Sequence, residues 1–261
     1  MAGYSRYVAI GDSQTEGLWD GDDTAGLRGF ADRLAEIVDR HYPGLTYANL
    51  AVRGRRIRDL LDEQLPQALA MEPELVTVCI GMNDVTRPGP YFDHALAELE
   101  DLHAQLSLSG ATVVTTTFPD IAQIIPIGRV LAARVLRIND EIRKAADWYD
   151  FRLVDLYDAP SMTHPDTWSA DRVHGSPKGH ALFAAAAAEA LGLPGSNHDW
   201  AALGDGPIRQ SIGSMAYSQA LWTYNMLMPW LWRHARGRSA GDGLGPRRPR
   251  LESVATLSRR A

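Results

Sequence analysis

The sequence predicts an α/β sandwich built around a parallel sheet. Five short runs of apolar and β-branched residues recur along the chain, and a stretch with helical spacing follows each of them. Because apolar residues fill consecutive positions in these runs instead of alternating, the runs are typical of parallel strands that helices cover on both faces. The regular alternation of strand and helix favours right-handed crossovers between the strands.

The predicted elements follow one another in a simple order. The expected strands cover residues 6–10, 46–51, 75–80, 112–117 and 152–156. Between and after them, apolar residues recur every three or four positions, which is the period of one helix face. The expected helices cover residues 30–41, 57–65, 92–106, 131–142 and 182–191. Residues 1–195 therefore form the predicted α/β domain.

Composition and charge narrow the functional classes. The formal net charge of −6 combines two unlike parts: from Arg233 onward eight arginines accompany two acidic residues, whereas 18 basic and 30 acidic residues precede them. An acidic body argues against nucleic acid as a partner. The single cysteine, Cys79, excludes an intramolecular disulfide, and its apolar neighbours predict a buried thiol. The first residues lack a secretory signal pattern, so we expect a cytoplasmic location.

Two segments follow the predicted domain. Residues 196–237 are expected to form a helical extension, because apolar side chains between 208 and 226 fall near one helix face. We favour packing of this face on the domain or on a second copy in a homodimer, and peripheral contact with a membrane surface is the alternative. Polar residues and Pro229 disfavour a membrane span. Residues 238–261, rich in Gly, Pro and Arg, are expected to be a mobile basic tail.

Unusual residue clusters follow the predicted strands, at the carboxyl ends where parallel sheets bind ligands. The first is "YVAIGDSQTEG", residues 7–17, in which an apolar strand runs directly into Gly-Asp-Ser. Ser13 is either a nucleophile or only a cap on the helix that follows. A serine hydroxyl becomes a useful nucleophile when a base removes its proton and a third group orients that base. Partners elsewhere in the chain must therefore decide between the two roles.

One histidine has a suitably spaced acid. Among the eight histidines, only His174 has an aspartate three residues earlier. In a turn, Asp171 can fold back onto the imidazole Nδ1–H, fix its tautomer and stabilise the imidazolium. Taken alone, the pair is better explained as a chance feature of a surface loop. His164 is the rival base, but its partner Asp166 follows it with Pro165 between them, which makes inward folding awkward.

Three groups can donate to the oxyanion that forms when a nucleophile attacks an ester. The Ser13 backbone N–H is the first. Gly54, just past the second strand, has no side chain and can bring an unshielded N–H close to the substrate. Asn83, after the third strand, offers an amide N–H. Each of the last two also has a plain structural interpretation, a turn for Gly54 and an Asx-turn or helix cap for Asn83.

Four blocks taken together are far more specific than any one of them. The blocks "GDSQTEG", "NLAVRG", "IGMND" and "DRVHGSPKGH" occur in the order and positions of the SGNH (GDSL-type) hydrolase family, which the sequence resembles from about Tyr7 to Leu191. The resemblance implies a flavodoxin-like three-layer α/β/α sandwich with a five-stranded parallel sheet, to which the C-terminal helical extension is added. Gln14 stands where the family most often has leucine.

The resemblance also implies a role for each matched residue. It implies that Ser13 is the nucleophile, that His174 is the base and that Asp171 is the acid that orients it. The implied oxyanion hole consists of Ser13, Gly54 and Asn83. The implied activity is that of a serine hydrolase, esterase- or lipase-like, which cleaves a small-molecule or lipid carboxylic ester through an acyl-enzyme on Ser13.

Two alternatives to this activity remain. An acyltransferase would use the same triad, because the motifs do not distinguish water from another alcohol as the acyl acceptor. A non-catalytic flavodoxin-like module would hold a phosphate ligand at a helix N-terminus through the Gly-Asp-Ser loop. Phosphate binding does not require Asn83, Asp171 and His174, so we favour catalysis. No cofactor is expected, because the sequence has neither metal-ligand spacing nor a nucleotide-binding glycine motif.

Overall fold

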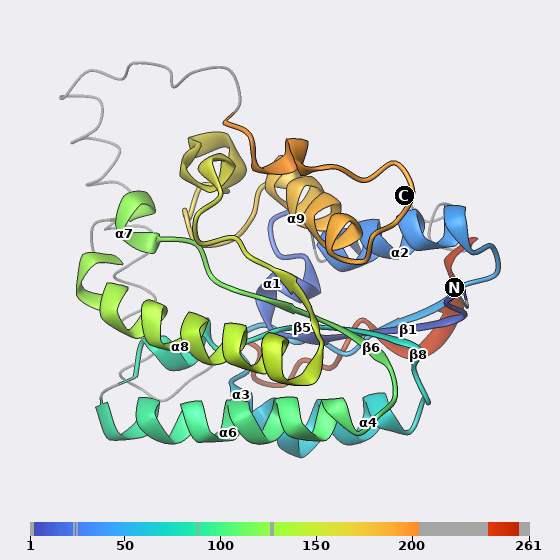
Figure 1. The fold of residues 1–261 in the computed structure, drawn as a ribbon, viewed down its shortest axis with the longest axis horizontal. Coiled ribbons are helices and arrows are strands. Elements are labelled where there is room, and N and C mark those ends of the chain that lie inside the picture. Colours follow the sequence, from blue (N-terminus) through green and yellow to red (C-terminus); the bar gives the residue numbers. More distant parts are fainter. Residues whose placement is uncertain are drawn as a thin grey trace.

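The computed structural model describes residues 3–22, 24, 26–87, 89–125, 128–203 and 240–255. These residues build a six-stranded sheet with the strand order β7-β6-β5-β1-β4-β8 (Figure 1). Five of its strands are parallel: β1 (Arg6–Gly11), β4 (Thr46–Asn49), β5 (Leu75–Cys79), β6 (Thr112–Thr116) and β7 (Arg152–Val154). The predicted parallel strands are confirmed, and one antiparallel strand is added at the sheet edge.

Helices cover both faces of the sheet and make the predicted three-layer sandwich (Figure 1). One face carries α2 (Phe30–His41) and α9 (Pro177–Ala190), which pack against each other. The opposite face carries α3 (Ile57–Asp59), the π-helical turn η1 (Leu60–Gln64), α4 (Leu65–Leu69), α6 (Gly89–Ser107) and α8 (Gly128–Tyr149).

Short elements occupy the connections between the strands and the long helices. They are α1 (Ser13–Glu16), β2 (Gly21–Asp22), β3 (Gly26–Leu27), α5 (Met82–Val85), α7 (Ile121–Ile124), η2 (Pro160–Thr163), η3 (Pro165–Thr167) and η4 (His198–Ala201). The sequence patterns predict the strands and the long helices because these bury a whole face. A helix of one turn has too few residues to show a period.

Local hydrogen bonds determine where two of the long helices begin. At the start of α2, the Gly29 N–H donates to the Asp32 carboxylate at 3.1 Å, so a side chain satisfies a backbone donor that lies outside the helix. α9 begins with Pro177 after Ser176, whose hydroxyl accepts the Gly179 N–H at 3.1 Å. Because α9 directly follows the long loop after β7, its capped start also anchors the end of that loop.

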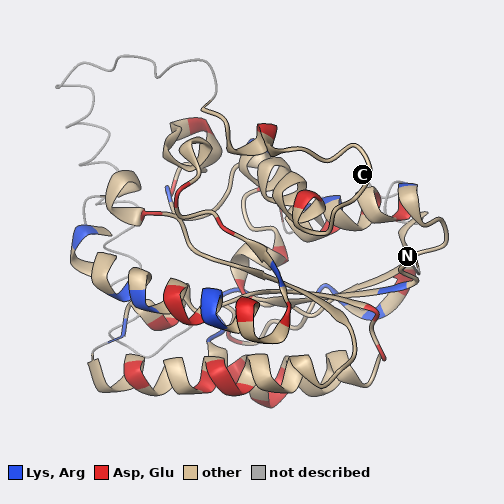
Figure 2. Cartoon of the chain, viewed as in Figure 1, with Lys and Arg blue, Asp and Glu red and all other residues tan. Residues whose placement is uncertain are grey.

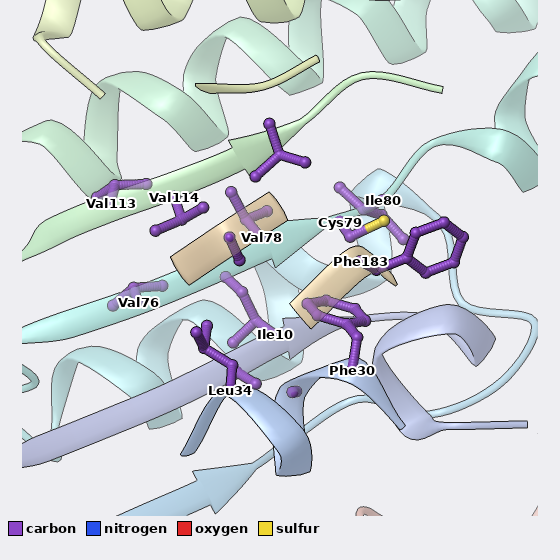
Figure 3. Packing of buried hydrophobic residues seen from close by; sticks show 14 of the residues in the cluster. Ile10, Phe30, Leu34, Val76, Val78, Cys79, Ile80, Val113, Val114 and Phe183 are labelled. Carbon is purple, nitrogen blue, oxygen red and sulfur yellow. The ribbon is translucent and has the colours of Figure 1, made fainter. Parts of the chain in front are cut away.

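The hydrophobic core fills the space between the sheet and both helix layers. Figure 3 shows Ile10 and Val114 of the strands gathered with Phe30 of α2 and Phe183 of α9. A large apolar side chain that folding removes from water contributes about 1.5–3 kcal/mol. Cys79 belongs to the same cluster, as predicted, and burial raises the pKa of its thiol. The thiol is therefore protonated and unreactive near neutral pH.

The C-terminal segment corrects one expectation. The sequence predicts a mobile tail over residues 238–261, and this is wrong for residues 240–255, which lie against the domain. Here β8 (Arg248–Ser253) pairs antiparallel with β4, with Thr46 opposite Ser253 and Tyr47 opposite Glu252. The prediction considered apolar burial alone and overlooked backbone pairing with an open sheet edge. Residues 204–239, which include most of the predicted extension 196–237, lie outside the described residues.

Charged side chains anchor β8 to the domain. Arg247 Nη2 and Arg248 Nε each lie 3.2 Å from the carboxylate of Asp32, which is only 2% exposed. Burial raises the pKa of this carboxyl, and the two guanidinium groups oppose the shift. Beyond the strand, the buried Val254 donates its N–H to the Leu45 carbonyl oxygen at 3.1 Å. Ion pairs and backbone hydrogen bonds thus supplement the little apolar surface that this segment buries, chiefly at Val254.

The two helices on the opposite face differ in charge. Figure 2 shows acidic residues and no Lys or Arg along α6, whereas α8 carries residues of both charges. Among the described residues, no helix is long and apolar enough to cross a membrane. The stretch 210–232, for which the sequence favours packing over surface docking and disfavours a membrane span, lies outside those residues.

A buried histidine makes stability depend on pH. His103 of α6 is 1% exposed, and burial lowers its pKa to about 4 from about 6.5. The unfolded state therefore binds the proton more tightly, so the contribution of neutral His103 is present above pH 6.5 and is lost as pH falls towards 4. The lost contribution amounts to about 3 kcal/mol at most. We expect His103→Leu to lose less stability than the wild type between pH 6.5 and 4, measured by urea unfolding.

The control for this prediction lies on the same helix. The side chain of His94 is 73% exposed and lies 3.1 Å from Glu98, so His94→Leu replaces an exposed histidine and leaves the buried one in place. The part of the pH dependence that His103 contributes should persist in this variant. An unchanged slope in the His103 variant would show that this histidine is not the group that titrates.

Candidate active site

Ser13 begins α1 directly after β1, at the carboxyl end of the sheet (Figure 1). The turn before it depends on Gly11, whose φ is 154° and where a Cβ atom would lie 2.5 Å from the Cys79 carbonyl oxygen. Asp12 then caps α1 by accepting the Gln14 N–H at 3.3 Å. The strand, the glycine and the cap together present the Ser13 hydroxyl beyond the carboxyl ends of the paired strands β1 and β5. The long helices that follow these two strands cover opposite faces of the sheet, so this is its switch point.

A chain of short hydrogen-bonding contacts joins Ser13, His174 and Asp171. Ser13 Oγ lies 2.7 Å from His174 Nε2, and His174 Nδ1 lies 2.6 Å from Asp171 Oδ2. When the Nδ1–H donates to the carboxylate, Nε2 is left without a proton and can accept one from the hydroxyl. The second carboxylate oxygen accepts the N–H groups of Val173 at 2.9 Å and His174 at 3.0 Å. The turn and the imidazole are therefore oriented by the same carboxylate.

The charge of Asp171 is stabilised by its neighbours. Burial alone would raise the pKa of this carboxyl, but hydrogen bonds from His174 and Ser169 outweigh burial and hold the pKa well below its usual range. Asp171 is therefore ionised throughout the neutral range. A fixed negative charge beside the imidazole favours its protonated form, which is the form a general base adopts after it has taken a proton.

Gly54 lies in the turn after β4 and Asn83 lies in α5, and a hydrogen bond joins these two segments. Gly54 has a φ of 77°, in the left-handed region that favours glycine. The Asn83 amide donates at 2.9 Å to the carbonyl oxygen of Arg55, the residue after Gly54, and at 3.1 Å to Asp12 Oδ2. Both amide hydrogens thus have protein acceptors. Donation to an oxyanion requires Asn83 to share one of these hydrogens with the substrate.

Asp12 connects the Ser13 turn to Asn83, and the sequence analysis did not find this contact. Burial raises the pKa of this carboxyl to about 6. Its Oδ1 caps α1 and its Oδ2 accepts a hydrogen bond from Asn83 of α5, so one side chain holds these two short helices together. The two residues are far apart in sequence, and they meet because the strands that precede them, β1 and β5, are neighbours in the sheet.

Gln14, which stands where the family most often has leucine, forms a second connection. Its Nε2 donates to the Val173 carbonyl oxygen at 3.2 Å, and its Oε1 accepts the Gly175 N–H at 3.2 Å. These two partners flank His174. The side-chain amide of Gln14 therefore bonds to the residues on both sides of His174 and connects their loop to α1. Leucine at this position would not provide these hydrogen bonds.

Two further histidines are engaged away from the Ser13 hydroxyl. His164, the rival base, accepts the Asp166 N–H at 3.2 Å through Nδ1 and caps η3. His180 is buried; its Nδ1 accepts the Phe30 N–H at 3.2 Å and its Nε2 lies 3.2 Å from the Leu18 carbonyl oxygen. Burial lowers the pKa of His180 to about 4, so this ring is neutral near pH 7.

Comparison with known proteins places this site in a family. The profile of the GDSL-like lipase/acylhydrolase family matches residues 9–182, which is more than half of the chain. The chain belongs to this family. The match includes every residue named above for the site, and it confirms the predicted membership of the SGNH (GDSL-type) hydrolases.

Individual proteins resemble the chain over most of their length. An acetylxylan esterase from Geobacillus stearothermophilus is 25% identical over 215 residues, which cover 72% of this chain and 94% of that protein. An α/β hydrolase enzyme from the metagenome of Lake Arreo, Spain, has a TM-score of 0.61 at 25% identity, with 74% of this chain and 97% of that chain covered. A catalytic mutant of the Geobacillus esterase has a TM-score of 0.62 at 20% identity, with 76% and 99% covered. This GDSL-family protein is a carboxylic-ester hydrolase that acts on small-molecule esters.

Proposed function

We propose that the protein hydrolyses carboxylic esters through an acyl-enzyme formed on Ser13. The observation that carries the proposal is the pair of contacts at His174, 2.7 Å from Nε2 to Ser13 Oγ and 2.6 Å from Nδ1 to Asp171 Oδ2. A phosphate-binding loop needs the backbone N–H groups of α1 and has no use for an imidazole on the serine hydroxyl. The contacts therefore favour catalysis over binding.

The reaction has two halves in which His174 reverses its role. In the first, His174 Nε2 takes the Ser13 proton while Oγ attacks the acyl carbonyl, and the imidazolium then protonates the leaving alcohol. In the second, His174 takes a proton from a water molecule that attacks the acyl-enzyme, and the imidazolium then returns this proton to Ser13 Oγ as the acid leaves. Asp171 keeps the imidazole in one tautomer and stays ionised. The negative charge on the carbonyl oxygen is stabilised by the N–H groups of Ser13 and Gly54 and by the Asn83 amide.

The relatives suggest which esters to test first. A protein that is 25% identical over most of its length is an acetylxylan esterase. We therefore propose acetyl esters as the substrate class. Hydrolysis of p-nitrophenyl acetate should show a burst of p-nitrophenol that matches the enzyme concentration whenever the acyl-enzyme forms faster than it hydrolyses. Ser13→Ala should abolish both the burst and the steady rate, and a variant that keeps both would refute the proposed nucleophile.

Asn83→Ala should lower kcat for p-nitrophenyl acetate by about a hundredfold, the effect expected when one oxyanion donor is lost. KM should change little, because the donor acts on a charge that develops only in the transition state. Asn197→Ala is the matched control, since Asn197 is exposed and caps η4 far along the chain. If the Asn83 variant kept the wild-type kcat, the Asn83 side chain would serve only to connect α5 to Asp12 and Arg55.

A further inference from the structure

A buried ion pair connects α1 to the turn that contains Gly54, the two segments that carry the backbone oxyanion donors. Glu16 is the last residue of α1, three positions after Ser13, and Arg53 immediately precedes Gly54. Arg53 donates to the Glu16 carboxylate from its backbone N–H at 2.7 Å, from Nε at 3.1 and 3.0 Å and from Nη2 at 2.8 Å. The two side chains, of Arg53 and Glu16, are 13% and 5% exposed, respectively. This ion pair is therefore largely shielded from water, unlike a salt bridge on the protein surface.

The geometry of this pair restricts how α1 and the Gly54 turn can move relative to each other. A guanidinium that donates to a carboxylate from two nitrogens fixes the relative orientation of the two planar groups. Arg53 also donates its backbone N–H, so the carboxylate holds the main chain at the peptide next to Gly54 and not only a flexible side chain. α1 has only four residues and cannot keep its own position through helical hydrogen bonds. Its direction depends on such tertiary contacts.

The C-terminal segment, residues 240–255, contacts the backbone of both residues of this ion pair. Arg247 Nη2 donates to the Glu16 carbonyl oxygen at 2.6 Å and Nη1 donates to the Leu27 carbonyl oxygen at 2.5 Å. A Cβ atom at Gly241 would lie 2.1 Å from the Arg53 carbonyl oxygen, so the C-terminal chain passes directly against the Arg53 backbone. Residues on both sides of the ion pair are thus in contact with residues 240–255.

We propose that Glu16 and Arg53 are positioning residues that set the Gly54 N–H relative to the Ser13 N–H, with Arg247 and Gly241 supporting them from the C-terminal segment. The inference rests on the proposed function, because it takes both N–H groups to be oxyanion donors. An oxyanion is stabilised only when its donors reach the place where the charge develops. A shift of about 1 Å in such a group can reduce the rate by about a hundredfold without touching the substrate.

Glu16→Gln tests the pair with the least change in shape. The substituted amide retains one oxygen for the Arg53 N–H, but it loses the charge and places an NH₂ group against a guanidinium. We expect kcat for p-nitrophenyl acetate to fall about tenfold to a hundredfold with KM nearly unchanged. Phenylboronic acid forms a tetrahedral adduct on a serine nucleophile, so its Ki should rise by the same factor. Arg53→Lys, which keeps the charge and loses the planar fork, should have the same effect.

A matched control separates positioning from a general loss of charge. Arg58→Met removes an ion pair with Asp62 whose side chains are 63% and 54% exposed, together with a longer contact of 3.7 Å to Glu98, and this variant should keep the wild-type kcat and Ki. A folded Glu16→Gln or Arg53→Lys enzyme with wild-type kcat and Ki would overturn the inference, as would a loss of kcat without a change in Ki. A wild-type enzyme without esterase activity would overturn the proposed function as well.

Discussion

His174→Ala is expected to lower kcat for p-nitrophenyl acetate by about 10⁴-fold or more, because Ser13 loses the base that takes its proton. The serine and the histidine act as one unit, so removing either should cost nearly as much as removing both. Residual activity should come from the oxyanion donors and from substrate binding. The measurement is steady-state hydrolysis by the purified variant, whose folding is checked by its thermal unfolding.

The control for this prediction is the rival histidine. His164 uses Nδ1 to cap η3, so His164→Ala should affect stability slightly and leave kcat nearly unchanged. If the His164 variant were inactive and the His174 variant active, the base would have been assigned to the wrong residue.

Removal of residues 240–261 is expected to lower the melting temperature by about 10 °C. The deletion removes β8 from the sheet edge and both arginines from Asp32, which is 2% exposed. A buried charge that loses its partners typically costs about 3–5 kcal/mol, and in a domain of this size 1 kcal/mol corresponds to about 2–4 °C. This expectation reverses the one from composition, in which a mobile tail could be removed without effect.

Point variants identify the origin of the effect. The double variant Arg247→Met/Arg248→Met should reproduce much of the loss of thermal stability, and Asp32→Asn in the same chain should restore part of it by removing the unpaired charge. Arg250→Met is the control from the same strand, because Arg250 is exposed. A shortened protein with the wild-type melting temperature would contradict the proposed role of these ion pairs.

The fold was largely predictable because its parallel strands bury both faces. Consecutive apolar residues in β1 and β5, and the period of α2 and α8, follow directly from burial. β8 was not predictable in the same way. Its sequence, "RPRLES", has one apolar side chain besides proline and is held by the edge of β4 and by Asp32, neither of which is near it in sequence. A pattern of apolar residues indicates which side chains are buried. It does not indicate that a strand pairs with the edge of another strand that is distant in sequence.

The site was predictable as a set of blocks but not as a set of contacts. Asp171 and His174 lie on one turn, so their spacing indicated their contact, and the family resemblance indicated Ser13 as their partner. The links from Asp12 to Asn83, from Gln14 to the His174 loop and from Glu16 to Arg53 join segments that meet only in the folded chain. These links fix the positions of the loops, and residue types alone did not reveal them.

Labelling with a fluorophosphonate tests the central claim, that Ser13 is an activated nucleophile, more directly than any rate. The reagent forms a stable phosphonyl ester on a serine whose proton can be removed, and it needs no knowledge of the natural substrate. We expect one adduct per chain in the intact mass of the wild type, located on Ser13 by peptide mapping, and no adduct on Ser13→Ala. Robust labelling of the Ser13→Ala protein, or a folded wild type that is never labelled, would contradict the account.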